Sequence, residues 1–93
     1  MEYQPKPIDT SDIILPDGIS DILEELAKNT HEVWAAGKLK EGYSTEQNAG
    51  KMTHPSLIPY EDLPESQKEY DRNTLLETIR LLIKLGFDNQ KRS

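Results

Sequence analysis

The stretch "PDGISDILEELAKNTHEVWAAGKLK", residues 16–40, decides the fold, because its apolar residues recur at the spacing of one helical face. At ~100° per residue that face carries Ile19, Ile22, Leu23, Leu26, Ala27, Val33 and Trp34, with Thr30 and Gly37 on the same stripe. Pro16 and Asp17 favour the start of a helix, although Gly18 weakens the first turn, and Gly42 favours its end. The sequence therefore predicts a long amphipathic helix over residues 17–40.

A second helix is predicted over residues 63–86, where apolar residues again recur at helical spacing. Its face is made by Leu75, Ile79, Leu82 and Ile83 and widened by Leu76 and Leu85. Two starts are open: a capping box from Asp62 to Glu65, or a Leu-Pro start like that of the first helix. Gly86 is expected to close this helix before Phe87.

The remaining segments are predicted to be extended or irregular. Pro5 and Pro7 favour an extended N-terminal arm over residues 1–16, whose end, Ile13 to Leu15, we expect to tuck into the domain. Residues 42–62 form a polar loop that tightens into "HPSLIPY", residues 54–60, and residues 88–93 form a frayed tail. The predicted fold is mainly α: two long antiparallel amphipathic helices, the arm and a structured loop, with short β-strands as an option, and the domain proper over residues 17–87.

Length, charge and composition exclude several functions. A chain of 93 residues is one small domain that hides only roughly 60–65% of its unfolded surface, so its core is marginal and a partner subunit would help. The net charge of -6 and the scattered basic residues leave no stripe for nucleic acid. There is no cysteine for thiol chemistry, and "MEYQPKPIDT" has no signal-peptide core. We expect a cytoplasmic protein without membrane insertion.

The apolar face of the second helix is interrupted by charge. Continued from Leu75 toward the start of the helix, the face becomes Arg72, Asp71 and Lys68. One interpretation is a partly buried ion pair of Asp71 or Arg72 that fixes how the helix docks on the arm or loop. The other is a pocket for an anionic ligand, which suits Arg72 best because a guanidinium presents a planar fork of donors.

The pair His31-Glu32 does not indicate a zinc-protease helix, because position 35, where the second histidine is needed, is alanine. His31 and Asn29 flank the apolar stripe, and we expect His31 to be half-buried and hydrogen-bonded to loop backbone. His54 could meet His31 in space, but two histidines alone are weak evidence for a metal. Trp34 is expected to be the central packing residue. With no phosphate loop, nucleophile elbow or convergent carboxylates, we expect no catalytic residues, no metal and no cofactor.

Several multi-residue words resemble those of the ryanodine receptor repeat domain over residues 3–87. They are "YQPKPIDTSDIILP", "LAKNTHEVWA", "HPSLIPYEDLPESQKEYDR" and "TIRLLIKLGF", in this order. In the calcium-release channels this domain occurs as paired repeats of long helices with short strands, and one pair carries a phosphorylation loop that corresponds here to residues 42–53. This chain instead resembles the single-copy bacterial and phage proteins. Ser44 and Thr45 lack the preceding basic residues of a kinase site.

The resemblance and the charged break in the second helix lead to two hypotheses. In the first, the protein is a non-enzymatic regulatory module that senses a nucleotide-like anion, because prokaryotic copies of the domain occur joined to ion-channel and nucleotide-signalling modules. Its pocket would be edged by Arg72, Lys68, His54, Tyr60, Asn29, His31 and Trp34. In the second, the protein is an interaction module with no small-molecule ligand, and a homodimer takes the place of the paired repeat.

Overall fold

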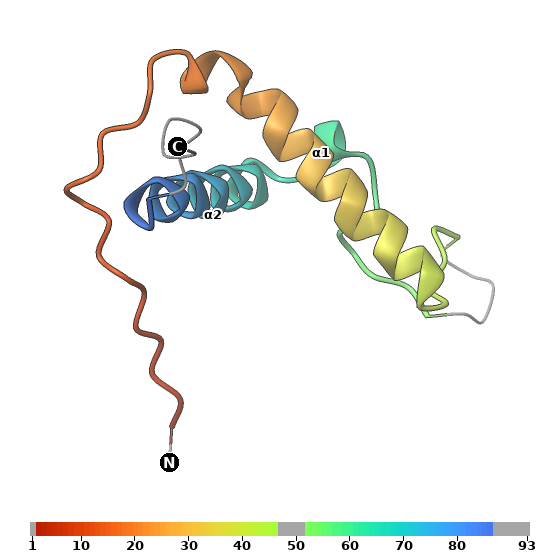
Figure 1. Ribbon diagram of the computed structural model, residues 1–93. Coiled ribbons are helices and arrows are strands. Elements are labelled where there is room, and N and C mark those ends of the chain that lie inside the picture. Colours follow the sequence, from red (N-terminus) through yellow and green to blue (C-terminus); the bar gives the residue numbers. More distant parts are fainter. Residues whose placement is uncertain (1, 47–51, 87–93) are drawn as a thin grey trace.

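Two helices and one short 3-10 turn make up the regular structure (Figure 1). The computed structural model describes residues 2–46 and 52–86. Helix α1 spans Ile19–Lys40, turn η1 spans Tyr60–Asp62 and helix α2 spans Glu65–Lys84. No strand occurs among these described residues. The prediction of a mainly α fold is confirmed, and the predicted tail, residues 88–93, lies outside the described part.

Glycines in the left-handed region of backbone space set the limits of α1. Gly18 has φ 93°, so α1 begins two residues later than predicted, after a turn in which the Ile19 N–H donates to the Pro16 carbonyl. At the other end Gly42 has φ 103° and its N–H donates to the carbonyl of Leu39. The helix therefore ends where the sequence predicted, before Gly42.

Helix α2 begins by the second of the two predicted starts, the Leu-Pro start. Pro64 is the N-cap with extended backbone, no side chain caps the helix, and the N–H groups of Gln67 and Lys68 donate to the Pro64 carbonyl. Asp62 is part of η1, so it forms no capping box with Glu65. Gly86, with φ 87°, follows the helix and closes its last turn onto the Ile83 carbonyl.

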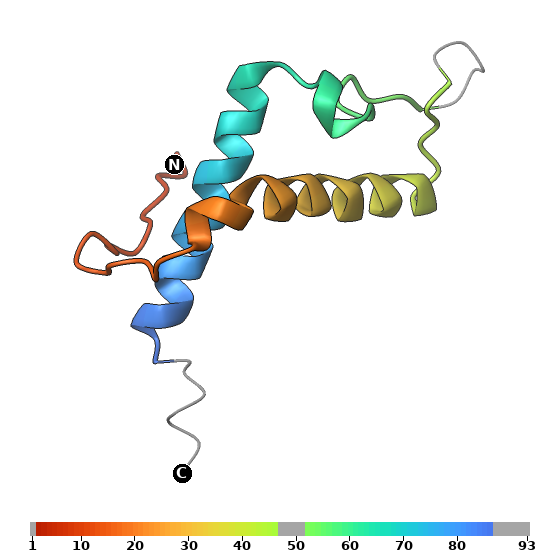
Figure 2. The same ribbon diagram turned by 90° about the horizontal axis from the view of Figure 1, so that it is seen from above.

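The two helices cross steeply, which corrects the prediction that they lie antiparallel (Figure 2). The physical reason is that the loop, and not α2, covers the middle of α1. Ala27 of α1 is fully buried, and Tyr60 and Leu63 pack against it together with Ile58. These loop residues cover part of the apolar stripe of α1, so α2 does not pack along the length of α1 (Figure 2).

The buried core is small. Among the described residues the buried apolar side chains are Ala27, Leu57, Tyr60 and Leu63, and α2 has no buried residue at all. The radius of gyration is 16.9 Å, against roughly 12 Å expected for a compact chain of this length. Trp34 is only half-buried, so Tyr60 and not Trp34 is the central packing residue. The chain folds around one short patch of α1 and leaves much apolar surface in water.

The N-terminal arm is extended, as predicted, and lies on α2. Thr10 is buried and its hydroxyl donates to Glu77 Oε1 at 2.7 Å, and Arg80 Nη1 donates to the Ile13 carbonyl at 2.6 Å. The expected tucking of Ile13 to Leu15 is wrong for Ile14, which is 90% exposed. The arm is held by the hydrogen bonds of Thr10 and of the Ile13 carbonyl, whereas Ile13 and Leu15 are only half-buried.

We predict that Leu63→Ala costs about 2–4 kcal/mol of unfolding free energy, because Leu63 is 4% exposed and packs against Ala27 and Tyr60. The matched control is Leu85→Ala, since Leu85 is 73% exposed and its truncation should change stability by no more than about 0.5 kcal/mol. Urea unfolding followed by circular dichroism measures both. Equal losses in the two variants would contradict a core centred on the loop and α1.

Candidate functional site

The structure places six of the seven predicted site residues in two groups. Arg72, Lys68 and Tyr60 gather around Glu24 where α1 and α2 cross. His31, Trp34 and His54 line a cavity further along α1. Asn29 is exposed on α1. It does not line that cavity and takes no part in the hydrogen bonds of Tyr60 and Arg72 to Glu24. The single pocket expected from the sequence is therefore replaced by two neighbouring sites, whose Tyr60 and His31 rings lie 6.2 Å apart.

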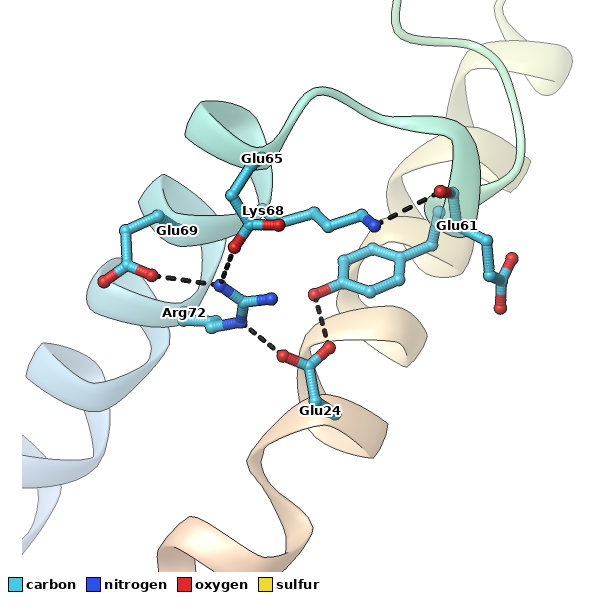
Figure 3. A network of polar contacts seen from close by, with 7 residues as sticks. Glu24, Glu61, Glu65, Lys68, Glu69 and Arg72 are labelled. Carbon is cyan, nitrogen blue, oxygen red and sulfur yellow. Dashed lines mark hydrogen bonds and ion pairs between the residues drawn. The ribbon is translucent and has the colours of Figure 1, made fainter.

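Arg72 is the centre of a charge network that joins the two helices (Figure 3). Its Nε donates to Glu24 of α1, and its Nη1 donates to Glu65 Oε2 and Glu69 Oε1 of α2, both at 2.9 Å. The Arg72 side chain is 18% exposed, whereas the three carboxylates reach it from the solvent side. The three carboxylates together raise the pKa of Arg72 above its already high value. This set of four residues is called the Arg72 network below.

Tyr60 links the Arg72 network to the core. Its hydroxyl donates to Glu24 Oε1 at 2.9 Å, and burial, together with the Glu24 carboxylate, raises the pKa of this phenol. The pKa of Glu24 is lowered by Arg72 and, to a smaller extent, by the Tyr60 hydroxyl. Lys68 lies 5.5 Å from the Tyr60 ring centre, and its ammonium donates to the Glu61 carbonyl at 3.2 Å.

Of the two interpretations of the charged break, the structure contains the ion pair. Arg72 is paired, but with α1 and its own helix instead of the arm or loop that the sequence suggested. An anion at this position would meet three carboxylates already occupying the guanidinium. Asp71 does not join the pair and instead accepts a hydrogen bond from Gln67 Nε2 at 3.0 Å, one turn earlier on α2.

The second site is a cavity of about 330 Å³ between α1, α2 and the loop, called the aromatic cavity below. Helix α1 lines it with Thr30, His31 and Trp34, and the loop lines it with His54 and Ser56. Helix α2 closes it with Gln67, Tyr70 and Asp71. Asp71 is the one carboxylate among these lining residues, and no lysine or arginine is among them. The cavity wall therefore contains no fixed cation that would attract an anion.

The hydrogen bonds of the two histidines determine which nitrogen of each neutral ring donates a hydrogen bond and which accepts one. His31 is 6% exposed and its Nε2 lies 2.7 Å from the Ile58 carbonyl, so Nε2 carries the proton and Nδ1 is left as an acceptor. This confirms the expected bond from His31 to loop backbone. His54 is the reverse case, because its Nδ1 accepts from the Ser56 N–H at 3.0 Å, which leaves Nε2 as the donor.

Trp34 lies between the two imidazoles. The His31 ring stacks on the indole at 5.5 Å with 24° between the planes, and the His54 ring meets it edge-on at 4.9 Å. Lys38 lies one turn further along α1, with its ammonium 6.0 Å from the Trp34 ring and 5.0 Å from the Tyr43 ring. Trp34 is therefore an aromatic platform with a cation over its ring.

Sequence reasoning missed several residues of this site. Thr30 lies on the stripe of Trp34 but was not selected, and Ser56, Gln67 and Tyr70 line the cavity but belong to no pattern that would have selected them. Lys38 had a usable signal, because it follows Trp34 by four positions and such residues lie on the same side of a helix. Asp71 was noted only as part of the charged break in α2. The signal for the site was helical spacing around Trp34, not the cations of α2.

The fold and the two sites define a small helical protein module with an aromatic cavity. No group of three potential metal-ligating residues occurs in residues 2–46 and 52–86. Neither helix of that part has a sufficiently apolar stretch to span a bilayer. A family model described as the RyR domain matches residues 3–91. The chain therefore belongs to the RyR domain family, which confirms the resemblance of its sequence words.

We predict that the Arg72 network makes stability depend on pH. The folded pKa of Glu24 lies below its usual value of 4.5, so the stability this group contributes is full above that value and is lost as the pH falls through the folded pKa. Arg72→Gln should lower Tm at pH 7 and flatten the loss of Tm below about pH 4.5. Calorimetry across pH 3–7 measures both effects.

The control for this prediction is Lys28→Gln, which removes a pair between two exposed side chains, Lys28 and Glu61. That pair lowers the pKa of Glu61 as well, but it does not join the helices. Lys28→Gln should leave Tm at pH 7 almost unchanged, because exposed ion pairs contribute little. The same slope of Tm with pH in the Arg72 variant and the wild type would contradict the role of the Arg72 network.

Proposed function

We propose that this RyR domain protein is a non-enzymatic, cytoplasmic, ligand-sensing module, and that the aromatic cavity binds the ring of a nucleotide-like ligand. The observation that carries the proposal is Trp34, held between His31 and His54 at the wall of a cavity of about 330 Å³. Cavities of this volume, apolar with a few convergent polar groups, are the usual form of small-molecule sites. The relation to ion channels implied by the resemblance belongs to this proposal too.

The polar groups around Trp34 suit the edge of a heterocyclic base. His31 Nδ1 accepts, His54 Nε2 donates, and the Asp71 carboxylate accepts. A ring with an exocyclic amine next to a ring nitrogen, such as adenine, offers the matching donors and acceptors. Stacking of a base on an aromatic side chain contributes about 1–3 kcal/mol. The base is thus the part of the ligand that the cavity recognises.

The anionic part of such a ligand is placed at Lys38 and not at Arg72. Lys38 lies over the Trp34 ring, and its ion pair with Glu41 is long, at 3.4 Å between Nζ and Oε1. The guanidinium of Arg72 is already held by three carboxylates, and Asp71 repels a phosphate from the inside of the cavity. The phosphate of a nucleotide would then lie outside, over Lys38.

We predict that adenosine monophosphate quenches the fluorescence of Trp34, the sole tryptophan, and raises Tm by mass action on the folded state. Trp34→Leu should abolish the rise in Tm. Lys38→Gln should weaken adenosine monophosphate but not adenosine, because it removes only the contact with phosphate. Fluorescence titration and thermal-shift measurements with a panel of nucleotides, including cyclic dinucleotides, give both quantities.

Arg72→Gln is the matched control for the location of the anion. It removes a cation from the same chain outside the cavity, so the nucleotide-induced rise in Tm should persist, measured relative to the lower starting Tm of this variant. Loss of the rise in Arg72→Gln together with retention in Lys38→Gln would reverse the proposed placement. No change of Trp34 emission with any nucleotide at millimolar concentration would overturn ligand sensing.

A second candidate function, self-association as a homodimer, is favoured by the exposed apolar surface of α2. No residue of α2 is buried, and Leu82 and Leu85 at its end are among the large apolar side chains left exposed. A chain with so small a core is stabilised when a second copy covers such a face. In this function the module docks through α2, and the aromatic cavity serves only the packing of the loop.

We predict for this second candidate that the protein is a dimer at submillimolar concentration and that Leu82→Lys with Leu85→Lys makes it a monomer. Charged side chains at these positions would have to be desolvated in the interface. Light scattering coupled to size exclusion measures the mass. The control is Ile22→Lys, which introduces the same charge at an exposed apolar position of α1 instead of α2. A wild type that stays monomeric over the whole concentration range would contradict the dimer.

A further inference from the structure

Tyr70 of α2 forms part of the wall of two neighbouring cavities. On one side it lines the aromatic cavity with Trp34 and His54. On the other it lines a groove of about 460 Å³ between the N-terminal arm and α2, together with Pro7 and Ile8 of the arm. Its side chain is 67% exposed, so no core packing holds it in place. The position of this ring therefore affects the shape of both spaces.

The arm reaches Tyr70 from anchors that all lie further along α2. Thr10 bonds Glu77, the Ile13 carbonyl accepts from Arg80, and Asp12 pairs with Lys84 at 3.2 Å. Glu77 and Tyr70 lie two turns apart on one side of α2, so the residues before Thr10 extend over the turn that carries Tyr70. Pro7 and Ile8 are thereby placed beside the tyrosine without being anchored themselves.

We propose that the N-terminal arm regulates the aromatic cavity by holding Tyr70 in place as its wall. With the arm docked, Pro7 and Ile8 restrict the ring from the groove side, and the cavity keeps its shape around Trp34. With the arm released, Tyr70 turns into the vacated groove and the cavity opens toward water. This inference rests on the proposed function in one respect, since the property that the arm controls is affinity for the ligand.

The strength of the anchors suits a releasable arm. They are hydrogen bonds and an ion pair, Lys84 with Asp12, whose partners are 35% and 68% exposed. Such exposed pairs are weak and are screened by salt. Thr10 is the only buried residue among residues 2–10. Release of the arm thus disrupts little packing, and segments of this kind open at low free energy.

Coupling of this kind acts in both directions. If docking of the arm improves the cavity for a ligand, a ligand in the cavity must favour the docked arm by the same factor. A partner that binds the exposed, proline-containing arm and removes it from α2 would lower the affinity of the cavity. The arm and the cavity then form a switch in which Tyr70 is the positioning residue.

The experiment uses the full chain and requires no ligand, because Trp34 itself reports on the cavity. The variant Thr10→Val/Asp12→Asn/Arg80→Ala removes the three anchors. We expect it to increase quenching of Trp34 by acrylamide, because the cavity around the indole opens toward water. Tyr70→Ala should give a similar increase by itself, and adding the anchor substitutions to Tyr70→Ala should give no further increase.

Release of the arm is measured separately with a nitroxide label on a cysteine introduced at Ser11, which is exposed, in a chain that has no other cysteine. The matched control, Glu2→Gln/Lys6→Gln, changes two exposed arm residues and should leave both label mobility and Trp34 quenching unchanged. A mobile arm with unchanged quenching overturns the proposal, and so does additivity of Tyr70→Ala with the anchor substitutions. Neither result depends on whether a nucleotide binds.

Discussion

The structure depends on the carboxylate of Glu24, which bonds the loop through Tyr60 and the second helix through Arg72. Helix α2 buries no residue, so the usual cause of helix docking, a buried apolar stripe, is weak here. The position of α2 is instead fixed by a directed polar contact where the helices cross. This is costly in desolvation but specific in geometry, because a planar guanidinium with three carboxylates fits few arrangements. The loop, α1 and α2 are thereby held in one arrangement by few apolar contacts.

The sequence predicted the elements well because their signals are local. Helical spacing, the Leu-Pro starts and the closing glycines are all read within a few residues, and both helices lie where these features indicated. The antiparallel arrangement was wrong because it depends on which segment covers α1. The loop residues Tyr60 and Leu63 do so. Their apolar character alone does not determine whether they or α2 pack against the apolar face of α1.

The site was predictable in its parts and not in its assembly. His31 was expected to bond loop backbone, and an ion pair of Asp71 or Arg72 was one of the two interpretations of the charged break, since buried polar groups need partners. His31 and Arg72 belong to different sites because the helices cross steeply. The periodicity of the sequence does not predict this crossing. The proposed recognition of a ligand by Trp34 and Lys38, and not by Arg72, follows from the same separation.

The arm gives the order in which this fold is completed during synthesis. Its links to α2 join residues 67 to 72 positions apart, the longest separations among the polar contacts described. The arm leaves the ribosome well before its partners, because Glu77, Arg80 and Lys84 follow the arm residues they bind by 67 to 72 positions. The crossing of α1 with the start of α2 can therefore form while the arm is still free, and arm docking is the last step. A nascent chain stopped before residue 77 would contain the partners of Glu24 but would have nothing to hold its N-terminus.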